Sequence, residues 1–178
     1  MADFEVSLLL HRLRNTGKME IISISETCDS LTAQSGLTYI PQKRIVDVTD
    51  MSEVSALIIP GGPINNEQNA VCELACKLLN DGRLVAAICF APQFLGRAGI
   101  LENYRYTKSC SAEKIAALGC DDPFNWENYV EKRVVTDKNL ITAQGYAFVD
   151  FAKAVCDYLK IFENSRQEYE QIDRIKES

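Results

Sequence analysis

Two short, wholly apolar runs constrain the fold of this chain more than any other feature. They are "ALIIP" at residues 56–60 and "LVAAI" at residues 84–88. Apolar residues with helical spacing follow each run, over residues 67–79 and 91–98. Runs of this kind are typical of parallel strands that helices cover on both faces. The order strand, helix, strand, helix predicts an α/β fold, a doubly wound three-layer sandwich of the flavodoxin type with a mostly parallel central sheet.

The remaining segments complete a single domain. We expect helices over residues 3–16, 112–118 and 148–159, strands over 19–25 and, more weakly, 103–109, an irregular edge hairpin over 36–48 and a second hairpin over 133–143. The polar tail from Ser165 places Tyr169, Ile172 and Ile175 on one side of a helix, which could pack on the body or on a second subunit. A length of 178 residues predicts one domain over 1–162 with a helical extension over 163–178.

The charge balance excludes several classes of partner. A net charge of -6 and a pI near 4.9 leave no basic surface for nucleic acid or for an anionic membrane. The sequence contains no run of about 18 apolar residues, the length that can span a bilayer. Asp3 and Glu5 precede the first apolar patch, which is the reverse of a signal peptide. We therefore expect a cytoplasmic protein.

Seven cysteines occur without a C-x-x-C pair, and His11 is the single histidine. A metal site therefore has few ligands to draw on, and we expect neither a metal nor an organic cofactor. Free cysteine is among the most buried residue types, so most of these thiols are expected to pack as small apolar side chains. Cys72 and Cys76, one helical turn apart, belong to this group.

Cys89 has a different setting, because it ends the second apolar run and directly precedes a helix. Helix-terminal N–H groups would favour the thiolate and lower the pKa of Cys89 below its ordinary value. Ala87 and Ala91 flank it in a small-x-Cys-x-small pattern, which resembles a nucleophile elbow. A cysteine that merely packs at a strand-helix junction fits the same pattern equally well. Gly61 and Gly62, after the first run, let the backbone approach closely, so that an N–H there and the N–H of Phe90 could hold an oxyanion.

Three segments, "LIIPGG", "AAICFAPQFLGRAGIL" and "KNLITAQGYAFVDFAKAV", are similar to the DJ-1/ThiJ/PfpI superfamily, part of the class I glutamine-amidotransferase-like fold. The resemblance covers nearly the whole chain. It implies that Cys89 is the elbow nucleophile and that Gly61 and Gly62 form the oxyanion-side turn. "ADFE" at residues 2–5 matches the family's first helix, which implies that Glu5 lies at the sulfur and shares a proton with it. Gly145 and Tyr146 are implied as pocket residues, and a homodimer as the assembly.

The chain departs from the family pattern at two places. Phe90 follows the cysteine where many members have histidine, and Ser109 and Cys110 stand where a further histidine is common. His11 would point away from Glu5 on the same helix. A histidine general base is therefore missing, and we do not expect a peptidase. The family also begins with a buried strand that leads into "ADFE", whereas Met1 stands at that point. Either upstream residues or another segment would fill that place in the sheet, and we favour the hypothesis of upstream residues.

Three functions remain open from the sequence. The first is a hydrolase, hydratase or glyoxalase-type enzyme for stress or detoxification, in which Cys89 attacks a small reactive carbonyl such as a 2-oxoaldehyde and Glu5 handles the proton. The second is a redox-responsive protein whose Cys89 is oxidised to sulfenic and sulfinic acid without turnover. The third is a binding module in which the elbow is a vestige.

Overall fold

The fold is given by a computed structural model that describes residues 1–64, 70–162 and 166–177. The helices are α1 (Phe4–Asn15), α2 (Ala70–Asn80), α3 (Pro92–Arg97), α4 (Ala112–Ala117), α5 (Phe148–Tyr158) and α6 (Arg166–Glu177). The strands are β1 (Ile24–Ser25), β2 (Leu31–Thr32), β3 (Thr38–Tyr39), β4 (Lys43–Arg44), β5 (Ala56–Ile59), β6 (Leu84–Ile88), β7 (Val134–Asp137) and β8 (Leu140–Ala143). Among these described residues, no helix has the length and apolar character needed to cross a bilayer.

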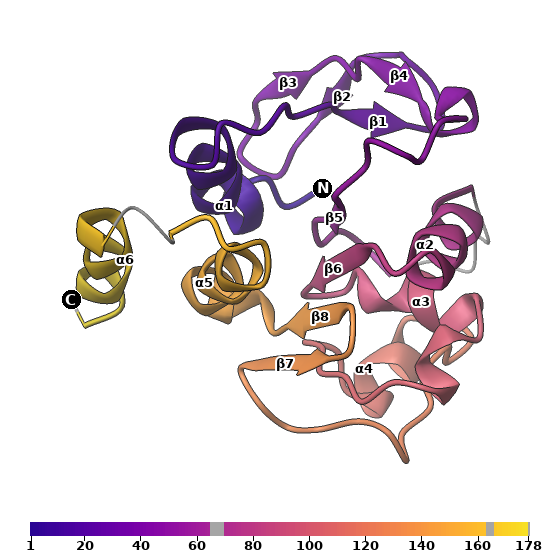
Figure 1. Cartoon of the computed structure of the whole chain (residues 1–178). Helices are drawn as coiled ribbons and strands as arrows, with labels where there is room; N and C mark the ends of the chain where they lie inside the picture. The colour runs from indigo at the N-terminus through magenta and orange to yellow at the C-terminus, as the bar shows by residue number, and fades with distance from the viewer. Residues whose placement is uncertain (65–69, 163–165, 178) are drawn as a thin grey trace.

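The central sheet has the strand order β5-β6-β8-β7, and only the β7–β8 pair is antiparallel. All five residues of β6 are buried, and alternate side chains point to opposite faces. Val85 and Ala87 belong to a core cluster with α2 and α3, while Leu84, Ala86 and Ile88 belong to one with α1 and α5. Figure 1 shows the resulting layers, with α1 and α5 on one side of the sheet and α2 and α3 on the other. The predicted three-layer α/β sandwich is confirmed.

Strand β5 differs from the prediction because it lies at the edge of the sheet. Leu57 and Ile59 are buried, but Ala56 and Ile58 are only partly buried, so the apolar run is not covered equally on both faces. The strand predicted over residues 19–25 shrinks to Ile24–Ser25, which pairs with β4 in a separate sheet. Figure 1 shows that this small sheet lies beyond β5. Within the described residues, no strand lies between β1 and β5 to connect the two sheets. That a further strand occupies this place stays a prediction.

Several local predictions need correction or lie outside the described residues. The first hairpin pairs Leu31–Thr32 with Thr38–Tyr39, so it ends before Pro41 instead of running through it. The weak strand over residues 103–109 is reduced to one bridge between Tyr106 and Tyr129, because side-chain hydrogen bonds hold much of this segment. The predicted start of the second helix at residue 67, the predicted start of the extension at residue 163 and the first residue of the tail, Ser165, lie outside the described residues.

The tail helix α6 packs on the body of the same chain. Ile172 is buried, Arg12 of α1 donates to the Gln171 side chain at 3.1 Å, and Lys153 of α5 forms an ion pair with Asp173 at 2.5 Å. The sequence had left open which surface the tail covers. The structure places it against α5, on the outer side of that helix layer (Figure 1).

Candidate active site

Cys89 lies on a sharp turn between β6 and α3. Its φ of 65° is in the left-handed region, which a residue other than glycine occupies at a cost of about 1–2 kcal/mol. Its N–H donates to the Ala143 carbonyl at 2.8 Å, and its own carbonyl accepts from Ser109 N at 3.0 Å. Ala87 and Ala91 are both fully buried at the bend. The backbone is therefore that of a nucleophile elbow, where surrounding structure holds a strained residue in place.

Helix α1 brings the Glu5 carboxyl to the cysteine. Only 3% of Glu5 is exposed, its Oε2 accepts from Gly61 N at 2.9 Å, and its side chain is hydrogen-bonded to Cys89. A Cβ atom added at Gly145 would lie 2.9 Å from both Cys89 Sγ and Glu5 Oε1, and one added at Gly61 would lie 2.8 Å from Cys89 Cβ. Both glycines thus leave the space that the carboxyl-thiol pair occupies.

The electrostatics of this pair differ from the sequence-based expectation in one respect. Burial raises the pKa of Glu5, as expected. The pKa of Cys89 is raised from 9.0 to about 12, by burial first and then by the charge and hydrogen bond of Glu5, whereas a lowered value was predicted. Helix α3 has only six residues, so its N-terminal field is small beside a buried carboxylate. At neutral pH Cys89 is accordingly a thiol, hydrogen-bonded to the Glu5 carboxyl group.

Ser109 is a site residue whose contacts were not predicted from the sequence. Its side chain forms a hydrogen bond to Cys89 that lowers the pKa of the thiol, and its Oγ accepts from Gly145 N at 2.7 Å. The hydroxyl therefore stands between the cysteine and the turn after β8. The only hint in the sequence is the position itself, where related chains often carry a histidine.

The backbone donors divide into two groups. Gly61 N is taken by Glu5, so this N–H supports the carboxylate and is not available to an oxyanion. The N–H of Phe90 points to the Cys89 sulfur. Gly62 N has no hydrogen-bond partner among the described residues. Of the predicted oxyanion donors, Gly61 and Phe90 are therefore already engaged by the carboxyl-thiol pair, and Gly62 N is the one without a partner among the described residues.

The other predicted residues lie at or away from this centre. Gly145 is buried against the pair, whereas the Tyr146 side chain is 62% exposed and lies over the Arg133 guanidinium at 5.0 Å from the ring centroid. His11 is exposed on α1 and takes no part in the site. In the described part of the chain, no group of three His, Cys, Asp or Glu side chains could hold a metal ion.

Comparison with known proteins identifies the family of the chain. The model of the DJ-1/PfpI family matches residues 1–157. The deglycase TK1284 of Thermococcus kodakarensis is 29% identical over 147 residues, which are 80% of this chain and 82% of the relative. Protein DJ-1 homolog A of Arabidopsis thaliana is 31% identical over 147 residues, 79% of this chain and 36% of that protein. The crystal structure of the DJ-1 superfamily protein Atu0886 from Agrobacterium tumefaciens superposes with a TM-score of 0.81 at 26% identity, over 99% of this chain and 94% of the other. The chain therefore belongs to the DJ-1/PfpI family.

Proposed function

We propose that this protein is an enzyme that uses Cys89 and Glu5 to process small reactive carbonyl compounds, with 2-oxoaldehydes as the substrate class. The observation that carries the proposal is the buried Glu5 carboxylate hydrogen-bonded to the Cys89 thiol on a strained elbow. A thiol with an adjacent base is the usual arrangement of an activated nucleophile. The name deglycase of the Thermococcus relative supports a detoxification role of this kind.

The first step is addition to the aldehyde carbon. Cys89 Sγ forms the new C–S bond while Glu5 takes the thiol proton, and the electron pair of the carbonyl moves to its oxygen. In this proposal the N–H groups of Gly62 and Phe90 would donate to the developing oxyanion. Glu5 then returns the proton to the oxygen and leaves a neutral hemithioacetal. This step needs no group besides those in the site.

The later steps reuse the same carboxylate. Glu5 takes the C–H proton of the former aldehyde carbon, giving an enediolate. The hydroxyl proton on that carbon passes to the neighbouring oxygen, and Glu5 returns its proton to the neighbouring carbon, which gives a thioester. Water then cleaves the thioester and releases the Cys89 thiol. The balance is one 2-oxoaldehyde plus one water to one 2-hydroxy acid, with no external oxidant or reductant.

The redox alternative is less well supported by the electrostatics. Oxidation by peroxide requires the thiolate, and burial together with Glu5 holds the pKa of Cys89 far above neutrality. The same carboxylate that suppresses the thiolate is well placed to accept a proton during attack on a carbonyl. The site therefore favours base-assisted addition over peroxide sensing.

Turnover of methylglyoxal to lactate tests the proposal. We expect wild type to consume the aldehyde and release lactate over many turnovers, and Cys89→Ala to abolish both. Cys28→Ala removes an exposed thiol outside the site and controls for non-specific adducts; its turnover should equal that of wild type. Loss of methylglyoxal without lactate, or equal rates in Cys89→Ala, would refute the proposal. Saturable oxidation of Cys89 without turnover would support the redox alternative instead.

A further inference from the structure

A buried lysine lies in an aromatic box next to the active site. Only 1% of Lys108 is exposed. Its Nζ lies 3.8 Å from the centroid of the Trp126 ring, 4.6 Å from that of Phe124 and 5.0 Å from that of Tyr129. These three rings, called the aromatic box below, surround the ammonium, which also donates to the Cys110 carbonyl. A desolvated cation among aromatic faces is attracted electrostatically by the rings.

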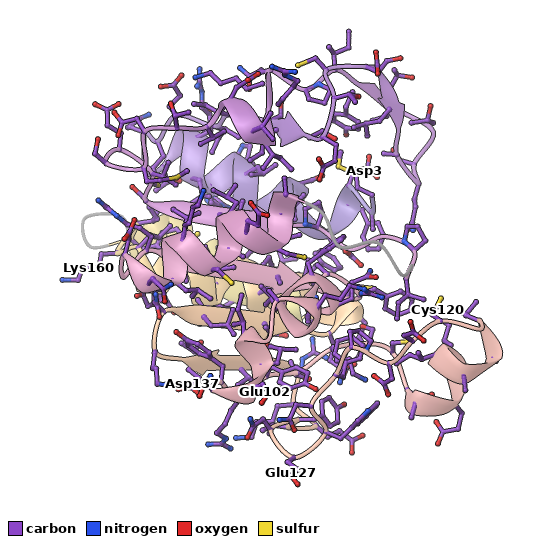
Figure 2. All side chains as sticks on the ribbon, turned by 90° about the vertical axis from the view of Figure 1, so that its right-hand side faces the viewer. Asp3, Glu102, Cys120, Glu127, Asp137 and Lys160 are labelled. Atoms are coloured by element: carbon purple, nitrogen blue, oxygen red, sulfur yellow. The ribbon has the colours of Figure 1, made fainter. Side chains whose placement is uncertain are left out.

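The aromatic box is built on a loop that is fastened to the body. Tyr106, fully buried, stacks on Phe124 with ring centroids 6.1 Å apart and donates its hydroxyl to the Asn125 carbonyl at 2.9 Å. Trp126 Nε1 donates to Asp122 at 2.7 Å. Glu127, in the same loop, points away from the body (Figure 2). The rings are therefore held in place by contacts that do not involve Lys108.

Lys108 is joined directly to the residue that contacts the nucleophile. Ser109, the next residue, donates its N–H to the Cys89 carbonyl at 3.0 Å, and its Oγ lies between Cys89 and Gly145 N. On the other side, Thr107 N donates to the Thr142 hydroxyl of β8 at 2.9 Å. The segment 107–109 thus crosses the carboxyl ends of β6 and β8. The ammonium of Lys108 fixes this crossing to the loop that carries the aromatic box.

We propose that Lys108 is a positioning residue: its ammonium, held in the aromatic box, keeps the Ser109 hydroxyl at hydrogen-bond distance from Cys89. Contacts with the rings stabilise one position of the Lys108 side chain. Because Ser109 is the next residue, the position of its backbone depends on that of Lys108. Lys108 itself touches no substrate. The proposal deepens the proposed function because it concerns the same cysteine, but its test measures the thiol and does not depend on turnover.

The protonation of Lys108 gives the arrangement a pH dependence. Burial lowers the pKa of Lys108 to about 8, opposed by the charges of Cys110, Asp122 and Glu113. The ammonium therefore loses its proton in mildly alkaline solution, and with it the attraction of the rings. Trp126 is the single tryptophan of the chain, so its fluorescence reports on the aromatic box alone.

The test is the rate of iodoacetamide reaction at Cys89, measured by peptide mass between pH 6 and 10. Ser109→Ala removes a hydrogen bond that favours the thiolate, and we expect alkylation about two- to tenfold slower at each pH. Lys108→Met should give the same decrease in the alkylation rate, and Cys89 in the double variant should react no more slowly than in Ser109→Ala. Lys108→Arg keeps the cation and should restore a rate near that of wild type. Trp126 fluorescence should titrate near pH 8 in wild type and not in Lys108→Met.

A folded Lys108→Met protein whose Cys89 is alkylated at the wild-type rate would overturn the proposal. So would a double variant whose decrease in rate equals the product of the decreases in Lys108→Met and Ser109→Ala. Should Lys108→Met fail to fold, Trp126→Leu removes the nearest ring and leaves the lysine. That variant must then slow alkylation of Cys89, and a rate equal to wild type would contradict the proposal. Absence of methylglyoxal turnover in wild type would refute the proposed function alone.

Discussion

Replacing Glu5 with glutamine should make Cys89 more reactive toward alkylation and at the same time inactive toward carbonyl substrates. The two effects have opposite signs because Glu5 has two roles. As a negative charge it suppresses the Cys89 thiolate, and as a base it would accept the thiol proton during attack. Glutamine keeps the size and the acceptor for Gly61 N but loses the charge.

The size of the first effect follows from the thiol pKa. With a pKa of about 12, about one Cys89 in 10,000 is ionised at pH 8. Burial is the largest cause of the rise and remains in the variant, so the pKa of Cys89 in Glu5→Gln should fall only part of the way back toward its ordinary value. Thiolate then increases about ten- to hundredfold. Intrinsic nucleophilicity falls as the pKa falls, with a Brønsted slope of about 0.5, so the net gain is about three- to tenfold.

Iodoacetamide alkylation of Cys89 at pH 8, measured by peptide mass, checks this prediction, with methylglyoxal turnover measured on the same samples. Glu53→Gln removes the same charge from an exposed position and should leave both rates unchanged. Slower alkylation in Glu5→Gln would refute the reasoning. That result would mean that wild type holds a thiolate stabilised by protonated Glu5, the arrangement that suits a redox sensor.

Two further predictions concern stability. Because Cys89 has a φ of 65°, Cys89→Gly should be more stable than Cys89→Ala by about 1 kcal/mol in urea denaturation, the reverse of the order in a helix; a more stable alanine variant would argue against the strained elbow. Asp3, labelled in Figure 2, accepts hydrogen bonds from Ser35 and from Tyr39 Oη at 3.0 Å, and chiefly the Ser35 bond lowers the pKa of Asp3. The ionised Asp3 carboxylate should contribute fully to the free energy of unfolding above pH 3.8, and this contribution should disappear as the pH falls through the lowered pKa of Asp3. Wild type should therefore lose more stability than Asp3→Asn between pH 5 and about pH 2, as measured by denaturant titration.

The layers of the fold and the elbow could be predicted because their signals are local. Five consecutive apolar residues before Cys89 can be covered only if both faces of the strand are buried, and β6 is buried in this way. The half-exposed β5 could not be predicted, because its exposure depends on which strands pair beside it. An apolar run specifies that a strand forms but does not specify its neighbour.

The chemistry of the site was harder to predict than its location. Position 109 attracted notice only as a missing histidine, and its contacts with Cys89 and Gly145 join three segments that are far apart in the sequence. The sign of the Cys89 pKa change was wrong for a related reason. A helix after the cysteine is visible in the sequence, whereas the depth of burial and the approach of Glu5 appear only in three dimensions.

The absence of histidine near Cys89 limits the reactions that the site can support. His11 is exposed on α1, so Glu5 is the carboxyl hydrogen-bonded to the sulfur that can take its proton. A carboxylic acid formed this way returns its proton fastest to a strongly basic atom close by, and the oxyanion formed by addition of Cys89 to a carbonyl is such an atom. Peptide hydrolysis also requires a proton donor for the leaving amine, which lies further from the sulfur. Histidine usually supplies this proton. Addition to an aldehyde followed by proton shifts between adjacent carbons keeps every proton within reach of one carboxyl group, which is why we propose small carbonyl compounds and not peptides as the substrates.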